Sequence, residues 1–281
     1  MKAGIGTSFE EVDPAFTNLI FPLADVIEVI PDTLAIKQGK YPVIPEATLQ
    51  HLAEMSEKAT IIIHGVGLSI GSYHGWNDHY FRLLDQILAV VPIAWHSEHL
   101  GFINVDGQFV GTMLALPRTR EALDLIAERT RQIRERYPLT FLLENIVNVL
   151  PDPPAEMTEA AFLNSLAYES GCELLLDIYN LECNAHNQNY AISDFLDELD
   201  LSLVREIHVA GGTERAGLML DIHSRRTRDM TRTLLPEILL RSPNVSALIY
   251  EVMPQAVPTL GHQAWADELH FLRSVTAQHE S

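Results

Sequence analysis

The chain has 281 residues, of which 47% are hydrophobic, and a formal net charge of −19 at pH 7. This length and apolar content suit one large α/β domain or two ordinary ones. The negative charge argues against a nucleic-acid partner, because phosphate backbones attract cationic surfaces. No stretch approaches the ~20 apolar residues that cross a membrane, and the first residues lack the parts of a signal peptide. We therefore expect a cytoplasmic protein with no membrane and no nucleic-acid partner.

Eight short apolar runs alternate with segments of helical spacing. The runs predict strands at 3–8, 26–30, 60–65, 93–100, 140–146, 173–180, 204–211 and 247–253. Helices are predicted at 80–90 after Asn77, at 118–137, from Thr158 to Gly171, at 194–199 with Ser193 as cap, at 231–241 and at 264–276. Strands that alternate with helices form parallel βαβ units, and eight of them predict a single-domain (β/α)8 TIM barrel over 1–281. The alternative is a doubly wound open sheet, but Gly4 and Gly6 lie too early for its glycine-rich turn and lack a third glycine.

The two cysteines are too few for a disulfide framework. Cys172 begins an apolar run, where an inert buried thiol is expected. Cys183 lies nearer a polar segment, and nothing in the sequence supports reactivity there.

Polar side chains close several of the predicted strands, at the end where TIM barrels carry their active sites. His64 ends the third strand and precedes a glycine-rich segment, 65–72, in which a substrate could approach the backbone. The fourth strand ends in His96-Ser97-Glu98-His99. The two-residue period of a strand places His96 and Glu98 on one face and His99 on the other. His99 is the preferred ligand, whereas His96 is equally consistent with packing.

The later strands add more oxygen and imidazole groups. These are Glu144 and Asn145, Asp177 and Asn180, Glu206 and His208, the loop pair Asp221 and His223, and Glu251. Buried carboxylates are costly unless they are neutralised, and Arg225, Arg226 and Arg228 lie in one loop and cannot serve every strand end. Bound cations could neutralise the carboxylates at every strand end. A mixed oxygen and imidazole set without cysteine spacing favours iron, manganese or zinc, and its size suits two or three ions.

These motifs, in this order, resemble the multinuclear non-heme iron-dependent oxidases typified by the methanobactin-biosynthesis enzyme. The resemblance extends from Gly4 to Glu251 and is carried by 67–72, 97–100, 143–145, 177–180 with 184–187, 206–211, 221–223 and 250–251. Three positions depart from the family's pattern: His96, Tyr179 and Gly212.

The resemblance implies a TIM barrel that holds two or three iron ions, in mixed Fe(II)/Fe(III) states, with O2 as co-substrate. By resemblance the metal ligands are His64, His99, Glu144, Asp177, Asn180, His208, Asp221, His223 and Glu251. Members of the family modify a cysteine or another residue of a ribosomally made precursor peptide. A partner protein that recognises the leader of this peptide is also implied.

Six further residues are expected near the reaction or the substrate. Glu98 is a candidate base or a residue that orients His99, and Asn145 is a candidate catalytic residue. Ser69, His186, Arg225 and Arg226 are candidate substrate-binding residues. The arginine loop could attract an acidic peptide or could be solvated charge beside an anionic cluster, and 184–187 is expected to be a loop.

Two other functions fit the same residues. A metal-dependent sugar isomerase or epimerase, or an endonuclease, of the xylose-isomerase-like class also places Glu, Asp and His at strand ends around divalent ions. An isomerase would need no oxygen, and the acidic charge weakens the endonuclease version. A non-enzymatic metal-dependent binding module is the third possibility.

Overall fold

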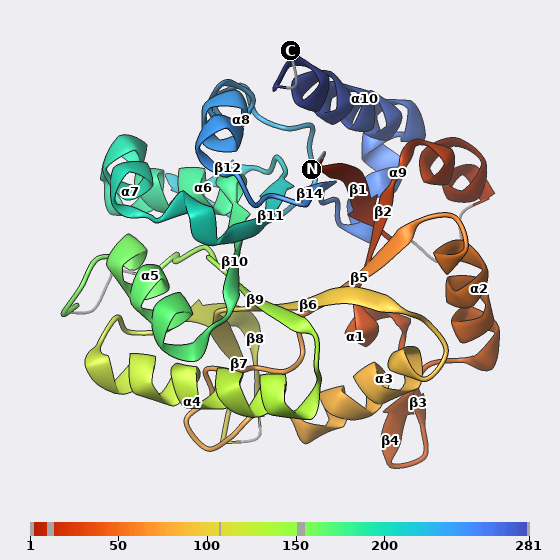
Figure 1. Ribbon diagram of the computed structural model, residues 1–281, viewed down its shortest axis with the longest axis horizontal. Coiled ribbons are helices and arrows are strands. Elements are labelled where there is room, and N and C mark those ends of the chain that lie inside the picture. Colours follow the sequence, from red (N-terminus) through yellow and green to blue (C-terminus); the bar gives the residue numbers. More distant parts are fainter. Residues whose placement is uncertain (1–2, 10–13, 107, 151–154, 280–281) are drawn as a thin grey trace.

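The computed structural model describes residues 3–9, 14–106, 108–150 and 155–279. Eight parallel strands close into a barrel in sequence order, with β1 pairing with β14 (Figure 1). They are β1 (Gly4–Ser8), β2 (Val26–Val29), β5 (Thr60–Gly65), β6 (Ile93–His99), β9 (Thr140–Glu144), β10 (Glu173–Asp177), β11 (Val204–Val209) and β14 (Ala247–Tyr250). The predicted (β/α)8 barrel is confirmed, and each of the eight predicted runs supplies one strand.

Helices surround the barrel on its outer side (Figure 1). The longer ones are α2 (Glu46–Ser56), α3 (Asp78–Leu88), α4 (Arg120–Arg136), α5 (Glu159–Ser170), α6 (Ile178–Gln188), α7 (Ile192–Glu198), α8 (Asp229–Arg241) and α10 (His262–His279). Shorter turns are α1 (Pro31–Leu34), α9 (Val257–Leu260), η1 (Phe16–Ile20), η2 (Phe21–Leu23), η3 (Leu201–Leu203) and η4 (Pro254–Ala256). Among these segments, no helix is long and apolar enough to cross a membrane.

The residues predicted to begin or end helices were correct for some helices and wrong for others. The side chains of Asn77 and Thr158 cap α3 and α5, and Gly171 ends α5 in a left-handed conformation, as predicted. The predicted Ser193 cap is wrong, because α7 already begins at Ile192.

The sixth strand is shorter than predicted. It ends at Asp177, whose carboxylate accepts a hydrogen bond from the backbone N–H of Asn180 and caps α6. The expected loop at 184–187 is therefore wrong, because these residues belong to a helix. Residues 178–185 are all buried. The apolar residues after Asp177 therefore belong to a buried helix, and the predicted strand does not continue through them.

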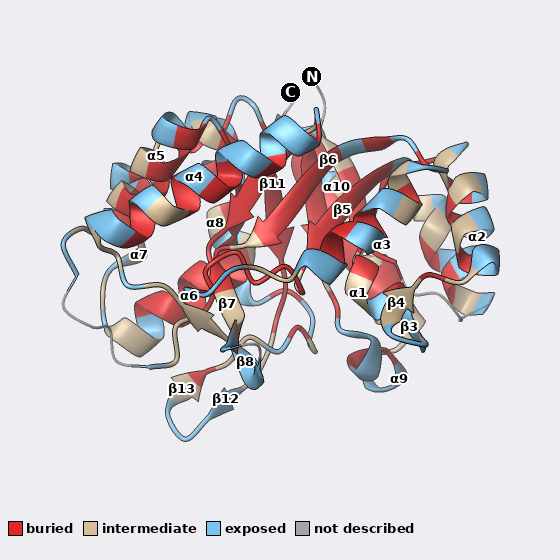
Figure 2. Cartoon of the chain, turned by 90° about the horizontal axis from the view of Figure 1, so that it is seen from below, coloured by how far each residue is buried: buried red, intermediate tan, exposed pale blue. Residues whose placement is uncertain are grey.

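In the described ranges, three two-stranded hairpins extend from the barrel, and none was predicted. They are β3–β4 (Ile36–Gln38, Tyr41–Val43), β7–β8 (Gly101–Val105, Gln108–Ala115) and β12–β13 (Glu214–Arg215, Leu218–Met219). Figure 2 shows β7–β8 and β12–β13 projecting from the same end of the barrel. These two follow β6 and β11 directly, so they rim the carboxyl ends of the barrel strands.

The barrel interior has an apolar layer below a polar one. The apolar layer contains Val26, Ile62, Trp95, Leu142, Leu175, Ala247 and Ile249. Because a strand turns every second side chain to the same face, the residues two positions further along also point inward. Those residues are Glu28, His64, Ser97, Glu144, Asp177 and Glu251. The strand period thus stacks a layer of ionisable groups on an apolar floor.

Candidate metal centre

The polar layer of the barrel brings the predicted ligand residues into overlapping groups. His64, His99 and Glu144 form one group, and Glu144, Asp177, His208 and Glu251 form another, with ligand atoms within 4.8 Å of one another. Glu144 Oε2 lies 3.2 Å from His64 Nε2 and 3.3 Å from His99 Nε2. Glu144 therefore stands between the two groups and could serve both.

A third set of side chains lies beside the second group. His223 Nδ1 is 2.9 Å from Glu251 Oε2, and its Nε2 is 2.9 Å from Asp221 Oδ1 and 3.6 Å from Asp177 Oδ2. The side-chain amide of Asn180 donates to Glu144 Oε1 and to the carbonyl of Asn145. All nine predicted ligand residues thus meet at the carboxyl ends of the strands.

Among the described residues, several buried oxygen and nitrogen atoms of this centre form no hydrogen bond, and some of them lie against one another at ion-pair distance. They are Glu28 Oε1, His64 Nε2, Glu144 Oε2, Asp177 Oδ2, Asn180 Oδ1, Asp221 Oδ1, and Nδ1 and Nε2 of His223. A buried polar atom that makes no hydrogen bond costs about 1–3 kcal/mol where no ion pair offsets the loss, and native folds seldom gather so many such atoms. Metal ions would satisfy them together. The donor set of carboxylates, imidazoles and one amide suits iron, manganese or zinc, and the residues present fit a metal centre.

The electrostatics of the centre agree with this fit. Burial opposes the charge on His64, but the carboxylates of Glu28 and Glu144 outweigh it and raise the pKa of His64 to about 10. Burial raises the pKa of Asp177 to about 7 despite the neighbouring His223. Within the described part of the chain, the carboxylates of the centre are not neutralised by arginines, so their negative charge would stabilise bound cations.

Glu98 lies outside the group of nine. It is fully buried on the outer face of β6 with His96, as the strand alternation predicted, and Tyr80 Oη lies 2.9 Å from His96 Nε2. His99 points inward, and its Nδ1 contacts the carbonyl oxygen of Gly65 at 2.9 Å. Within the part of the chain that the structure describes, no contact of Glu98 supports either suggested role, base or orienter of His99.

Asn145 holds the strand ends together. Its side chain accepts from the backbone N–H of Asp177 and donates to the carbonyl of Asp177, both at 2.9 Å. Asn145 is 3% exposed, and its side-chain amide oxygen and nitrogen are both used in these two hydrogen bonds. Asn145 therefore positions Asp177.

The four predicted substrate-binding residues are dispersed. Ser69 is 2% exposed, and its hydroxyl accepts from the backbone N–H of Ile103 in β7. His186 is exposed on α6 and contacts the carbonyl of Gly217. Arg226 forms an ion pair with Asp267. Arg225 is exposed, and its carbonyl accepts from the hydroxyl of Tyr250. The structure does not bring these four together around the centre.

Both cysteines are free and buried. Burial raises the pKa of Cys172 to about 11 and that of Cys183 to about 12. Cys183 packs with Tyr179, Ala210 and Met219, so both thiols are inert core groups.

Two carboxylates of the centre were not among the predicted ligands. His208 Nε2 lies 2.9 Å from Glu28 Oε2 and 3.3 Å from Glu206 Oε1. Glu206 is one of the polar residues noted on the later predicted strands but was not assigned as a ligand, and Glu28 was not among the candidates. A carboxylate inside the apolar run 26–29 was the available signal.

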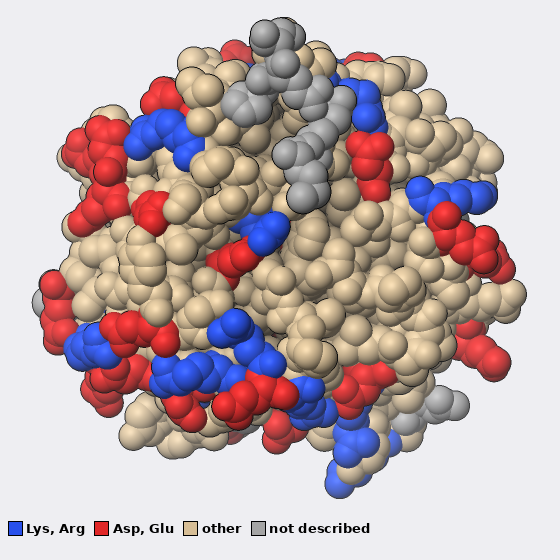
Figure 3. Space-filling view, in the orientation of Figure 1, with Lys and Arg blue, Asp and Glu red and all other residues tan. Residues whose placement is uncertain are grey.

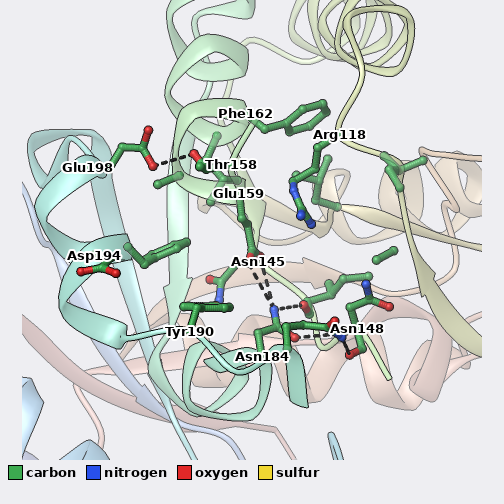
Figure 4. Close-up of a pocket in the computed structure, with 18 residues that line it drawn as sticks. Arg118, Asn145, Asn148, Thr158, Glu159, Phe162, Asn184, Tyr190, Asp194 and Glu198 are labelled. Carbon is green, nitrogen blue, oxygen red and sulfur yellow. Dashed lines mark hydrogen bonds between the residues drawn. The ribbon is translucent and has the colours of Figure 1, made fainter. Parts of the chain in front are cut away.

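A cavity of about 310 Å3 opens beside Asn145 (Figure 4). Figure 4 shows Arg118 and Phe162 on one side of it and Asn148 and Asn184 on the other. None of the nine predicted ligand residues lines this cavity, and Asn145, which also contacts Asp177, connects it to the candidate metal centre. Its mixed apolar and polar lining suits an amino-acid side chain.

The outer surface has a different charge pattern. On the face drawn in Figure 3, acidic and basic side chains alternate, mainly along the edge. Around α4, for example, Arg120 pairs with Asp124 and Glu169, and Arg131 pairs with Glu128. Among the described residues, the groups of carboxylates and histidines close enough to hold a metal ion lie inside the barrel.

Comparison with known proteins identifies the family and agrees with the fold. Residues 2–265 match the family model described as RiPP precursor modification enzyme MbnB/TglH/ChrH, where a RiPP is a ribosomally synthesised and post-translationally modified peptide. A UPF0276 protein of Acaryochloris marina is 33% identical over 72% of this chain and 73% of its own length. One of Chromobacterium violaceum is 33% identical over 69% and 70%.

Solved structures support the barrel fold. D-psicose 3-epimerase of Clostridium cellulolyticum H10 matches 98% of this chain and 99% of its own, with a TM-score of 0.60 and 12% identity. The 3-keto-D-glucoside 4-epimerase of E. coli matches with a TM-score of 0.62 and 15% identity, over 97% of this chain and 100% of its own. At these identities the likeness concerns the fold alone. The family match over almost the whole sequence, together with the curated relatives, shows that the chain belongs to the MbnB/TglH/ChrH family of RiPP precursor modification enzymes.

Proposed function

We propose that this protein is an oxidase that uses two or three iron ions and O2 to modify a residue, most simply a cysteine, of a ribosomally made precursor peptide. One observation carries the proposal: the nine residues converge at the strand ends, and six of them carry a buried oxygen or nitrogen atom that makes no hydrogen bond among the described residues. Family membership supports a peptide substrate. A partner protein that recognises the leader of the peptide is part of the proposal.

The ligand roles follow the three side-chain groups. His64 and His99 would hold one ion with Glu144, while Asp177, His208 and Glu251 would hold a second with the other oxygen of Glu144. Asn180, Asp221 and His223 would provide a third set. Bound iron would supply the electron transfer with O2, which side chains of these types do not perform themselves.

The protein's own residues position and shield the reacting groups. Asn145 clamps the strand end that carries Asp177, and the Gly65 carbonyl fixes the ring of His99. Both cysteines of the chain are buried in the core, so the reacting thiol comes from another molecule. The cavity beside Asn145 would hold a side chain that flanks the reacting residue and so place it at the centre.

The test is co-expression with the short peptide and the partner encoded beside the gene, followed by intact-mass measurement of the peptide. Protein purified without oxygen should contain at least two irons per chain and should consume O2 only with its peptide. Full activity in iron-free protein would end the proposal.

A sugar epimerase or isomerase remains the alternative. It would turn over with Mn2+ or Co2+ and would consume no O2, so an oxygen electrode distinguishes the two functions. Metal binding without turnover of any co-expressed peptide would indicate a binding module.

A further inference from the structure

His208 lies in the middle of the barrel, with carboxylates on both sides of its ring. It is fully buried. Nδ1 is 2.9 Å from Glu251 Oε2 and 3.9 Å from Glu144 Oε1, on the side of the predicted ligands. Nε2 faces Glu28 and Glu206 on the opposite side. The two ring nitrogens therefore meet different sets of carboxylates.

A neutral imidazole has one N–H donor and one lone pair, so the two sides of His208 cannot act alike. A nitrogen that binds a metal must present its lone pair. The other nitrogen then carries the proton and usually donates it to a carboxylate or a carbonyl, which fixes the ring. Nε2 of His208 and Oε2 of Glu28 are aligned as a hydrogen bond at 2.9 Å.

The carboxylates below His208 are held from different strands. Glu28 belongs to β2 and Glu206 to β11, and both are fully buried. Glu206 Oε2 accepts a hydrogen bond from the indole N–H of Trp95 at 2.8 Å. Trp95 belongs to the apolar layer of the interior, so this pair of acids closes the bottom of the metal centre.

We propose that Glu28 and Glu206 are positioning residues that hold His208 in the Nε2-protonated tautomer and so direct the Nδ1 lone pair to the metal centre. Glu28 is the main acceptor, and Glu206 supports it at 3.3 Å. This inference rests on the metal centre of the proposed function but not on its O2 chemistry.

Metal titration of the apo-protein with Co2+ tests the role of Glu28. Glu28→Ala removes the acceptor and should weaken binding of at least one ion by roughly 10–100-fold, the usual effect of losing such a partner. Glu28→Gln keeps an acceptor oxygen and should restore part of the affinity. The control is Glu173→Gln, which removes a strand carboxylate that pairs with Arg205 outside the barrel, and it should bind like wild type.

The tautomer can be read directly and does not depend on a variant that folds. In Zn2+-loaded wild-type protein with 15N-labelled histidine, NMR should show His208 protonated at Nε2 and metal-bound at Nδ1. Metal at Nε2 would overturn the inference, because Glu28 and Glu206 would then be ligands themselves. Wild-type affinity in Glu28→Ala would overturn it too. Failure of the wild-type protein to bind any metal would instead refute the proposed function.

Discussion

The two faces of β6 present two buried sets of ionisable groups with opposite properties. His99 on the inner face joins a centre whose carboxylates raise the pKa of buried histidines. On the outer face, burial lowers the pKa of His96 to about 3, and burial raises the pKa of Glu98 well above its usual value. The outer set is therefore neutral polar packing, whereas the inner set is charged. Burial of acids and histidines alone does not identify a metal centre, since atoms of His96 and Glu98 also make no hydrogen bond. Among the described residues, only the inner side gathers three or more ligand residues within 4.8 Å of one another.

The largest expected effect is a loss of bound iron, and it is expected when a carboxylate of the inner set, such as Glu144 or Asp177, is changed. Glu144→Ala should abolish retention of at least one iron, because Glu144 stands between two of the ligand groups. Asp177→Asn should do so too while keeping the cap of α6, since asparagine also caps helices well. Iron is measured by mass spectrometry after anaerobic purification, and circular dichroism checks the fold. Retained iron in folded Glu144→Ala would mean that the centre is misplaced.

The next largest effect is a loss of stability caused by a steric clash on the outer face of β6, where Glu98 lies. Gly65 lies opposite Glu98 in the barrel, and a Cβ there would come within 1.7 Å of Glu98 Oε1 and 2.3 Å of Tyr80 Oη. Gly65→Ala should lower the free energy of unfolding by about 1–3 kcal/mol, as overpacking usually does. Urea unfolding measures this loss. The double variant with Glu98→Ala should lose less than the sum of the single variants; strict additivity would contradict the contact.

A smaller loss is expected where one hydrogen bond is removed. Tyr80→Phe leaves Nε2 of His96 without the hydroxyl at 2.9 Å. The cost should be about 0.5–1.5 kcal/mol in the free energy of unfolding, the net contribution of one intramolecular hydrogen bond. Iron content should not change, and a loss of iron would show that the two faces are coupled.

The smallest effect is expected for Glu98→Gln. If the outer acid is neutral, the amide replaces it with little change in charge or volume, and the free energy of unfolding should change by less than about 1 kcal/mol. Iron content should equal that of wild type. A marked loss of iron would place Glu98 in the metal centre after all and would break the contrast between the two faces.

The strand order could be predicted because it depends on short-range periodicity, and so could the polar residues at the strand ends, whereas the set of nine ligands was implied by the family resemblance. A two-residue alternation decides which side chains of β6 point inward, and a TIM barrel gathers strand ends at one face. Other features depend on contacts that no local pattern encodes. Glu28 meets His208 from 180 positions away, and the partner of the Ser69 hydroxyl is 34 positions away. The start of α6 was missed because a buried helix and a buried strand have similar apolar runs.

Asp177 shows how the centre is prepared before any ion binds. One of its carboxylate oxygens accepts from the N–H of Asn180 at the start of α6, while the other has no hydrogen-bond partner among the described residues. The helix cap fixes the rotamer, so metal binding need not restrict a mobile side chain and loses less conformational entropy. The folding of α6 therefore contributes to metal affinity, and an ion bound to Asp177 would in turn slow the opening of the first turn of this helix.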